Sequence, residues 1–409
     1  MRDGRAPTGR VGGVTVEPVE GRRSLRAFLR FPEELYRGDP RWVPPLQRDE
    51  RARLAPSNPF FAHAEAQLFL ARRSGAVVGR VAAIVNRLHL AHRGDGAGFF
   101  GFFEAVPESA VAEALWGATA AWLRSRGLSV VRGPVNPSTH DECGVLTDGF
   151  DRPPCLLMPY NPPYYASLLE GVGLRPIREL VSYVVEVPQA LPARVDHVAR
   201  AAEGRGIRVR RLDPRRLGAE AEVIRSLYNA AWGENWGALP MTSGEASSLA
   251  SRLRAVLAPD LALIAESGDR PVGFILGLPD YNPALRLLRG RLTPWGAGPV
   301  PLAPAEARGG APHGLGRHSG GPAPGRGRLA VPGAAGGAPA SRPPLGRGRL
   351  DPRGQRRDPA GGGTLGRAGR QAVSAVRGAG LRARLAHGSR GVRRTQNAAS
   401  RAPARTSTA

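Results

Sequence analysis

The sequence predicts a layered α/β fold, and three features of its pattern support this prediction. Two pairs of apolar, β-prone segments flank short turns that contain glycine, which is typical of β-hairpins. Other segments repeat apolar residues at helical spacing. The order strand, helix, hairpin occurs in the first half of the chain and recurs after residue 206. We therefore expect two similar domains in tandem, each a mixed α/β layer.

The first domain is expected at residues 14–188, after a disordered leader at residues 1–13. Ser24 suits a helix N-cap, Pro107 suits a first helical turn, and Gly127 suits a helix end. The expected strands are Val14–Val19, Gln67–Arg72, Val77–Val85, Gly98–Ala105, Leu128–Val131 and Leu180–Val187. The expected helices are Ser24–Tyr36, Pro107–Gly127 and Tyr164–Glu170.

A linker with a short helix is expected at residues 189–205, and the N-terminal half of a second domain at 206–296. This half repeats the strand, helix and hairpin pattern. The expected elements are a strand at Ile207–Leu212, helices at Ala219–Ala231 and Thr242–Leu257, and a hairpin of Leu261–Glu266 with Pro271–Leu278. The pattern stops before enough strands are present to close a sheet, so we expect this second domain to be incomplete.

Residues 297–409 differ in composition from the rest of the chain. They lack Phe, Trp, Tyr, Ile, Met and Cys, and they carry 20 arginines against three acidic residues, which accounts for +17 of the net charge of +24. Such a segment cannot bury enough apolar surface to offset its chain entropy, so we expect a disordered tail. Our hypothesis is that this tail is a frameshift product. A genuine disordered tail and an arginine-rich nucleic-acid arm are the alternatives.

Composition also bounds the environment of the protein. The chain has no lysine, so all 58 basic residues are arginine, which fits a bacterial genome rich in G and C. Two cysteines are too few for a disulfide framework in 409 residues. The N-terminus lacks the apolar region of a secretory signal, and no apolar run is long enough to span a membrane. We expect a cytoplasmic protein without a membrane partner.

The stretch Arg132–Tyr165 concentrates turn-forming, ionisable and aromatic residues in one long loop. Functional residues often lie in such loops. Asp141, Glu142 and His140 are candidate catalytic residues, because a carboxylate or an imidazole can remove a proton from an amine. The loop also supplies candidate substrate-binding residues: Asn136, Ser138, Tyr160 and Tyr165. The alternative is that the polar residues only stabilise turns and the tyrosines only pack in the core.

Other histidines and cysteines give weaker signals. His140 and Cys143 are poorly spaced for a metal site with Cys155, so we expect no metal. Cys155 fits a small core residue. His63, His89 and His92 have no spacing to a partner residue and are expected at the surface.

Several strings in the chain resemble the GNAT acyltransferase superfamily, and in particular bacterial tandem GNAT-like proteins described only as N-acetyltransferase-like. The resemblance covers residues 14–296. It is carried by LYRGDPRWVPPL (35–46), NPFFAHAEAQLFLA (58–71), VGRVAAIVN (78–86), GFFGFFEA (98–105), RGPVNPSTHDECGVLTDGFDRPP (132–154), MPYNPPYY (158–165), YNAAWGENWGALPMT (228–242) and VGFILGLPDYNPAL (272–285).

The resemblance implies acetyl-CoA or another acyl-CoA as co-substrate. It also places Trp232, Asn235 and Trp236 on the acceptor-substrate side as candidate binding residues, with packing as the alternative. The GNAT pattern holds the CoA pyrophosphate in a glycine-rich loop between a strand and a helix. The corresponding residues 106–110 contain no glycine, and Glu104 and Glu108 add negative charge. No cofactor-binding residue can therefore be named.

These observations lead to an acyl-CoA-dependent N-acyltransferase as the expected function. We expect the chain to be inactive as encoded, because the CoA-binding half of the second domain is missing. The first alternative is a non-catalytic GNAT-like binding protein, and the second is a nucleic-acid binder acting through the arginine-rich tail. The acyl donor, the amine acceptor and the oligomeric state are not indicated by the sequence.

Overall fold

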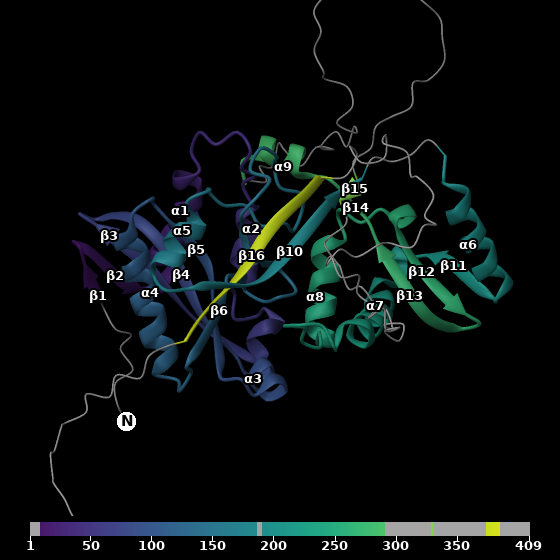
Figure 1. Ribbon diagram of the computed structural model, residues 1–409, viewed down its shortest axis with the longest axis horizontal. Coiled ribbons are helices and arrows are strands. Elements are labelled where there is room, and N and C mark those ends of the chain that lie inside the picture. Colours follow the sequence, from purple (N-terminus) through teal and green to yellow (C-terminus); the bar gives the residue numbers. More distant parts are fainter. Residues whose placement is uncertain (1–8, 186–189, 291–328, 331–373, 385–409) are drawn as a thin grey trace, which may run out of the picture.

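The computed structural model describes residues 9–185, 190–290, 329–330 and 374–384, and it places two units side by side (Figure 1). The first unit contains the large sheet, whose strand order is β1-β2-β3-β4-β5-β6-β16-β10, with β9 also paired to β16. Its strands are β1 (Gly9–Val11), β2 (Val14–Pro18), β3 (Ala64–Arg73), β4 (Ala76–Asn86), β5 (Ala97–Ala105), β6 (Val130–Gly133), β7 (Val135–Asn136), β8 (Glu142–Cys143), β9 (Val145–Leu146), β10 (Arg175–Val184) and β16 (Ser374–Arg384). The short strands β7 and β8 pair separately.

Helices cover both faces of this sheet. They are α1 (Gly21–Leu35), α2 (Gln47–Arg53), α3 (Arg87–Arg93), α4 (Ser109–Arg124) and α5 (Tyr165–Gly171), with a short 3₁₀ turn at Pro59–Ala62. On one face, Leu115 of α4 packs in a core with Phe69 and Val81. On the other face, Phe28 of α1 packs with Ile84. The fully buried side chains on both faces supply the apolar burial that stabilises the unit.

A bulge in β5 sets the shape of the sheet next to the long loop. Phe100 and Phe103 belong to the core under α4, whereas Phe99 and Phe102 belong to the core under α1. Strict alternation would put Phe102 on the same face as Phe100, so the strand shifts by one residue there. Phe102 has a φ of 49°, and the register with β4 slips between Arg80 and Ala82.

Beyond this bulge, β5 and β6 separate. They form a parallel pair only over Ala97–Phe99 and Val130–Arg132. The chain from β6 continues into β7, whose Val135 carbonyl lies against Gly101 of β5. A side chain at residue 101 would collide with that carbonyl, so glycine is required for the close approach. The long loop is thereby held against the middle of the sheet.

The second unit contains a three-stranded antiparallel sheet and three longer helices. Its elements are α6 (Ala193–Gly204), β11 (Ile207–Arg211), α7 (Leu217–Trp232), α8 (Ser243–Leu253), β12 (Ala262–Ser267), β13 (Arg270–Leu276), β14 (Leu278–Pro279) and α9 (Asn282–Leu288), with 3₁₀ turns at Pro214–Arg216 and Pro259–Leu261. The predicted hairpin is present as β12 and β13. Thr242 caps α8 through a capping box with Glu245, as its sequence indicates.

The predicted elements match the structure in most places and differ in four. Residues 9–11 form β1 within the expected disordered leader, and pair with β2. Helices α2, α3 and α9 and the short strands β7, β8 and β9 were not predicted from the sequence. Strand β10 begins at Arg175, five residues before the expected start, and α8 ends at Leu253 rather than Leu257. Helix α1 begins at Gly21 with Glu20 at its N-cap, so Ser24 lies inside the helix and does not cap it. Helix α4 spans Ser109–Arg124, so Pro107 precedes it and Gly127 follows it by three residues.

The fourth difference lies in the tail, where β15 (Leu329–Ala330) pairs with β14 and β16 pairs with β6 and β10. The remainder of 297–409, and with it the expected disorder and frameshift, lies outside the described residues. The mixed α/β fold is confirmed. The tandem arrangement and the incompleteness of the second unit stay predictions.

Candidate functional site

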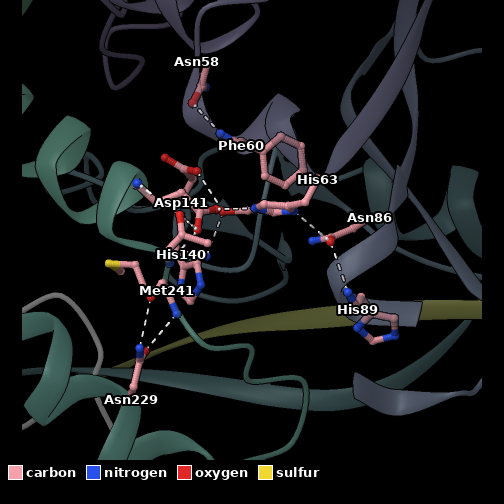
Figure 2. A network of polar contacts seen from close by, with 12 residues as sticks. Asn58, Phe60, His63, Asn86, His89, His140, Asp141, Asn229 and Met241 are labelled. Atoms are coloured by element: carbon pink, nitrogen blue, oxygen red, sulfur yellow. Dashed lines mark hydrogen bonds and ion pairs between the residues drawn. The ribbon is translucent and has the colours of Figure 1, made fainter. Parts of the chain in front are cut away.

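The loop between β6 and α5 lies against the second unit and brings two predicted catalytic residues to the boundary (Figure 2). His140 Nδ1 lies 3.3 Å from the hydroxyl oxygen of Tyr228 on α7. The Asp141 carboxylate accepts a hydrogen bond from Arg252 of α8 at 3.0 Å. Ser138 donates to the other Asp141 oxygen at 3.0 Å. This part of the loop therefore joins the two units.

A second histidine belongs to the same boundary. His63 Nε2 lies 3.3 Å from Glu245 of α8, and its Nδ1 lies 3.2 Å from the side-chain oxygen of Asn86. Burial lowers the pKa of His140, although Glu245 and Asp141 act to raise it. His140 is therefore biased towards the neutral form, which can accept a proton.

Glu142 lies in a different set of contacts. Its carboxylate is 3.4 Å from Arg53, which also pairs with Glu50 at 2.7 Å. Burial raises the pKa of Glu142, while Arg53 opposes that change. The contact between Glu142 and Arg53 is thus separate from the contact between His140 and Tyr228. Cys143, next in the chain, has its pKa raised by burial.

The four predicted substrate-binding residues of the loop make hydrogen bonds within the first unit. Asn136 accepts the backbone N–H of Phe102 at 2.6 Å, at the bulge of β5. Ser138 accepts the His140 N–H at 3.1 Å and so closes a turn. Tyr160 donates to Asp39 at 2.7 Å. These hydrogen bonds hold loops and turns in place, which is the structural role that stands as the alternative to substrate binding.

Tyr165 belongs to a buried polar cluster around the Glu104 carboxylate of β5. Its hydroxyl donates to Glu104 and accepts the Ala105 N–H at 3.1 Å. Tyr36 donates to the same Glu104 carboxylate at 2.8 Å, and Arg80 lies 3.6 Å from it. Burial raises the pKa of Glu104.

The turn between β5 and α4 does not fit a CoA pyrophosphate. It has no glycine, as the sequence shows. Glu108 occupies the N-cap position of α4 without capping it, and its carboxylate pairs with Arg73. The negative charge of Glu108 beside the helix N-terminus disfavours a phosphate there. No step of a reaction is therefore assigned to this turn.

A small, open pocket of about 70 Å³ lies where the two units meet. Its wall is almost wholly apolar. The lining comes from α3, β5, the loop after β6, β10 and the loop at residues 236–237, and it includes His89, Arg132, Cys143, Ile177, Leu180 and Trp236. The apolar wall suits a hydrocarbon group rather than a charged one.

Two of the predicted second-unit residues shape this pocket. Trp236 forms part of its wall, with the guanidinium carbons of Arg132 and Arg178 at 5.9 and 5.3 Å from the indole ring. The backbone carbonyl of Asn235 accepts a hydrogen bond from Arg93 of α3 at 3.1 Å. Trp232 instead stacks on Tyr228 at 5.2 Å, beside His140.

The surface position expected for His89 is wrong. His89 is 1% exposed, and its Nε2 lies 3.0 Å from the Asp95 carboxylate. Asn86 caps α3 by accepting the backbone N–H of His89. The N-cap signal of Asn86 three residues before His89 was present in the sequence and could have indicated this helix. His92, on the same helix, is exposed as expected.

Two absences apply to the part of the chain that the structure describes. Within it, no three His, Cys, Asp or Glu side chains are grouped in a way that could hold a metal ion. Within the same residues, no helix combines the length and the hydropathy needed to cross a membrane.

The chain matches no protein-family model, but it has two clear relatives among curated proteins. It is 34% identical to protein YghO of Escherichia coli (strain K12) over 280 residues, which cover 67% of this chain and 70% of YghO. It is 35% identical to the bacterial ceramide synthase of Caulobacter vibrioides (strain NA1000 / CB15N) over 285 residues, which cover 69% and 74% of the two chains.

Solved structures with a similar arrangement are more distant. A tandem GNAT protein from the clavulanic acid biosynthesis pathway is 14% identical, with a TM-score of 0.38 over 64% of this chain and 73% of that one. A GCN5-related N-acetyltransferase from Sphaerobacter thermophilus is 14% identical, with a TM-score of 0.35 over 78% and 81%. The two curated relatives decide the assignment: the chain belongs to the family that contains protein YghO and the bacterial ceramide synthase.

Proposed function

We propose that this protein is an N-acyltransferase that moves an acyl group from acyl-CoA to the amine of an apolar acceptor. The relative from Caulobacter is named for the synthesis of ceramide, which is an amide of a fatty acid and a long-chain amine. The observation that supports the proposal for this chain is the apolar wall of the open pocket between the units. Hydrocarbon surface buried there contributes about 25 cal/mol per Å² to binding.

The reaction requires one proton to leave the amine. The amine nitrogen attacks the thioester carbonyl carbon, a C–N bond forms, the C–S bond breaks, and the CoA thiolate leaves and takes up a proton. Backbone N–H groups would stabilise the negative oxygen of the intermediate. His140 and Asp141 stay candidate proton acceptors, although Tyr228 and Arg252 already occupy their polar atoms.

The test is amide formation by the full chain. The purified protein is mixed with acyl-CoA substrates of increasing chain length and with sphinganine or octylamine. Thiol release is followed with a disulfide dye, and the amide is identified by mass spectrometry. Thiol release that depends on both the amine and the protein is expected if the chain is competent. The Caulobacter relative serves as the positive control.

The inactivity expected from the sequence is a separate proposal, because it depends on residues after 296. An encoded chain that binds octylamine and acyl-CoA in calorimetry but forms no amide would support it. An encoded chain that forms amide would refute it, and one that binds neither ligand would refute the acyltransferase proposal. Translation of the gene's other two frames beyond codon 296 separates a lost activity from a genuine non-catalytic binding protein.

The nucleic-acid alternative also stays a proposal. It depends on the +17 charge of residues 297–409. A gel shift with RNA and DNA tests it, and binding has to disappear when the tail is removed.

A further inference from the structure

Helix α8 of the second unit is held against the first unit near both of its ends. At its first turn, Glu245 lies 3.3 Å from Nε2 of His63, the residue that follows the 3₁₀ turn at Pro59–Ala62. At its last turn, Arg252 donates to the Asp141 carboxylate at 3.0 Å. Arginine keeps its charge around neutral pH, whereas histidine titrates there, so the first of these two anchors can respond to pH.

Both ring nitrogens of His63 face oxygen atoms that can only accept a hydrogen bond (Figure 2). Nδ1 lies 3.2 Å from Oδ1 of Asn86, and this oxygen also accepts the backbone N–H of His89, which fixes the orientation of the amide. Nε2 lies 3.3 Å from Oε1 of Glu245, whose other carboxylate oxygen accepts both the N–H and the hydroxyl of Thr242. A neutral imidazole has one N–H, so it can satisfy only one of these contacts. Both contacts are hydrogen bonds only when the ring carries two protons.

The charged groups around His63 agree with a protonated ring. Glu245 lies in the first turn of α8, where the helix N-terminus stabilises its negative charge. His140 is the titratable neighbour from the long loop: burial lowers its pKa, nearby carboxylates act in the opposite direction, and the charge of His63 lowers it further. The 3₁₀ turn before His63 has no charged residue. Glu65 and Arg87, which follow on β3 and α3, pair with each other at 3.5 Å. His63 thus carries the positive charge that Glu245 meets.

Loss of one proton from His63 breaks the first anchor of α8. The neutral ring turns a lone pair towards either the Asn86 oxygen or the Glu245 carboxylate, at 3.2 or 3.3 Å. The side chains of His63 and Glu245 are only 17% and 12% exposed, so water replaces the missing hydrogen bond poorly. Gly244, beside Glu245, packs on Pro59 at the same place, because a Cβ added to it would lie 3.0 Å from the Pro59 Cβ. A weakened anchor therefore loosens that packing too.

We propose that the two units are joined by a proton-dependent latch, in which Glu245 of α8 holds the first unit only while His63 is an imidazolium. As His63 loses its proton, the first turn of α8 leaves the first unit, and the anchor at the other end of the helix stays as the pivot. The loop at residues 233–241 runs directly into this turn and carries Trp236 of the pocket wall. The latch therefore affects how closely that wall lies against the first unit. It does not require acyl transfer.

Hydrogen exchange of the full chain, followed by mass spectrometry, tests the latch. The peptide that covers α8 is compared at about pH 5.5 and about pH 8.5, on either side of the usual titration of imidazole, with each rate corrected for the intrinsic pH dependence of exchange. We expect protection in the parent protein to be at least about tenfold lower at the higher pH, the usual contribution of a hydrogen bond to a charged group. Protection that stays the same at both pH values overturns the latch.

Two conservative variants separate the latch from the effects of His89 and His140, whose burial favours the opposite pH dependence. Glu245→Gln removes the charge but keeps the capping box, because glutamine also serves at that position. His63→Gln keeps an N–H donor without a titratable group. In both variants we expect the protection of α8 to be independent of pH. His92→Gln, at an exposed position of α3, is the matched control and should keep the full change of the parent protein. A pH dependence that survives in His63→Gln refutes the proposal.

Nitrogen NMR reports the state of the ring directly. The full chain is labelled with ¹⁵N-histidine, and the His63 resonances are assigned by their absence in His63→Gln. We expect both ring nitrogens to carry a proton over the pH range in which α8 is protected, and one of them to lose it over the range in which protection falls. If α8 keeps its protection while His63 is neutral, the contact does not need the second proton and the latch is wrong.

Discussion

Replacing Gly101 by alanine tests how the long loop is held against the sheet. A Cβ at residue 101 would lie 1.6 Å from the Val135 carbonyl oxygen and 2.7 Å from its carbon. Both obstacles are backbone atoms, so β7 has to move. Overpacking of this kind costs about 1–3 kcal/mol. The movement also breaks the 2.6 Å hydrogen bond from the Phe102 N–H to Asn136, and a buried N–H left unpaired costs about 1–3 kcal/mol more.

The expected loss for Gly101→Ala is therefore about 2–6 kcal/mol, adding the two costs. The assay is thermal and urea unfolding followed by circular dichroism. A unit of this size loses about 2–4 °C of Tm per kcal/mol, so a decrease of at least about 4 °C is expected. Gly117→Ala is the matched control, because it lies on the exposed side of α4 with nothing within 4 Å of the added methyl group.

The control should be neutral or gain up to about 1 kcal/mol, since alanine favours a helix over glycine. If Gly101→Ala lowers stability by less than about 1 kcal/mol, the contact between β5 and β7 does not hold the loop as described.

Three further predictions follow from other contacts. Burial lowers the pKa of His89 and of His140, so the unfolded chain binds more protons than the folded chain below about pH 6.5. The free energy of unfolding should therefore be highest above that pH and should fall as the pH decreases. In urea unfolding, His89→Gln should reduce this fall between about pH 7.5 and about pH 5.5. If His89→Gln leaves the pH dependence of the free energy of unfolding unchanged, the lowered pKa of His89 is contradicted. Trp236→Ala should raise the Kd for octylamine about tenfold, in calorimetry, because about 1.4 kcal/mol of apolar contact is lost, while leaving Tm within a few degrees, since Trp236 is 49% exposed. A Kd equal to that of the parent protein would remove Trp236 from the pocket wall. Asp141→Asn and Arg252→Ala should be coupled by about 0.5–1 kcal/mol in a double-mutant cycle, because the pair is partly exposed; additive effects would mean that the contact between the units is not formed.

The sequence was most informative where structure depends on neighbouring residues. The hairpin of β3 and β4 and the helix α4 have turn residues and apolar spacing that identify them locally. Strand β16 has no such signal, because its pairing with β6 and β10 depends on residues far away in the chain. The short helix α3 was missed because seven residues are too few for a clear period.

The same distinction applies to the site. His140 and Asp141 could be selected because they stand in an unusual loop, and the structure places both against the second unit. The burial of His89 could not be predicted, since it depends on the packing of α3 beside β5 and on Asp95 and Arg132. The pocket itself joins residues from both units, and no local pattern in the sequence marks such a surface.

Helix α3 forms part of the pocket wall and also holds the loop that carries Trp236, another part of that wall. His89 and Arg93 are four residues apart, so they lie about one turn, roughly 6 Å, from each other along the helix axis. One borders the pocket, and the other donates to the Asn235 and Ala238 carbonyls and so fixes the loop that carries Trp236. The spacing between His89 and the indole of Trp236 is thus set by a rigid turn of helix. A protein of this family that accepts a bulkier amine would be expected to differ in the length of the loop at residues 233–238, while α3 keeps its length.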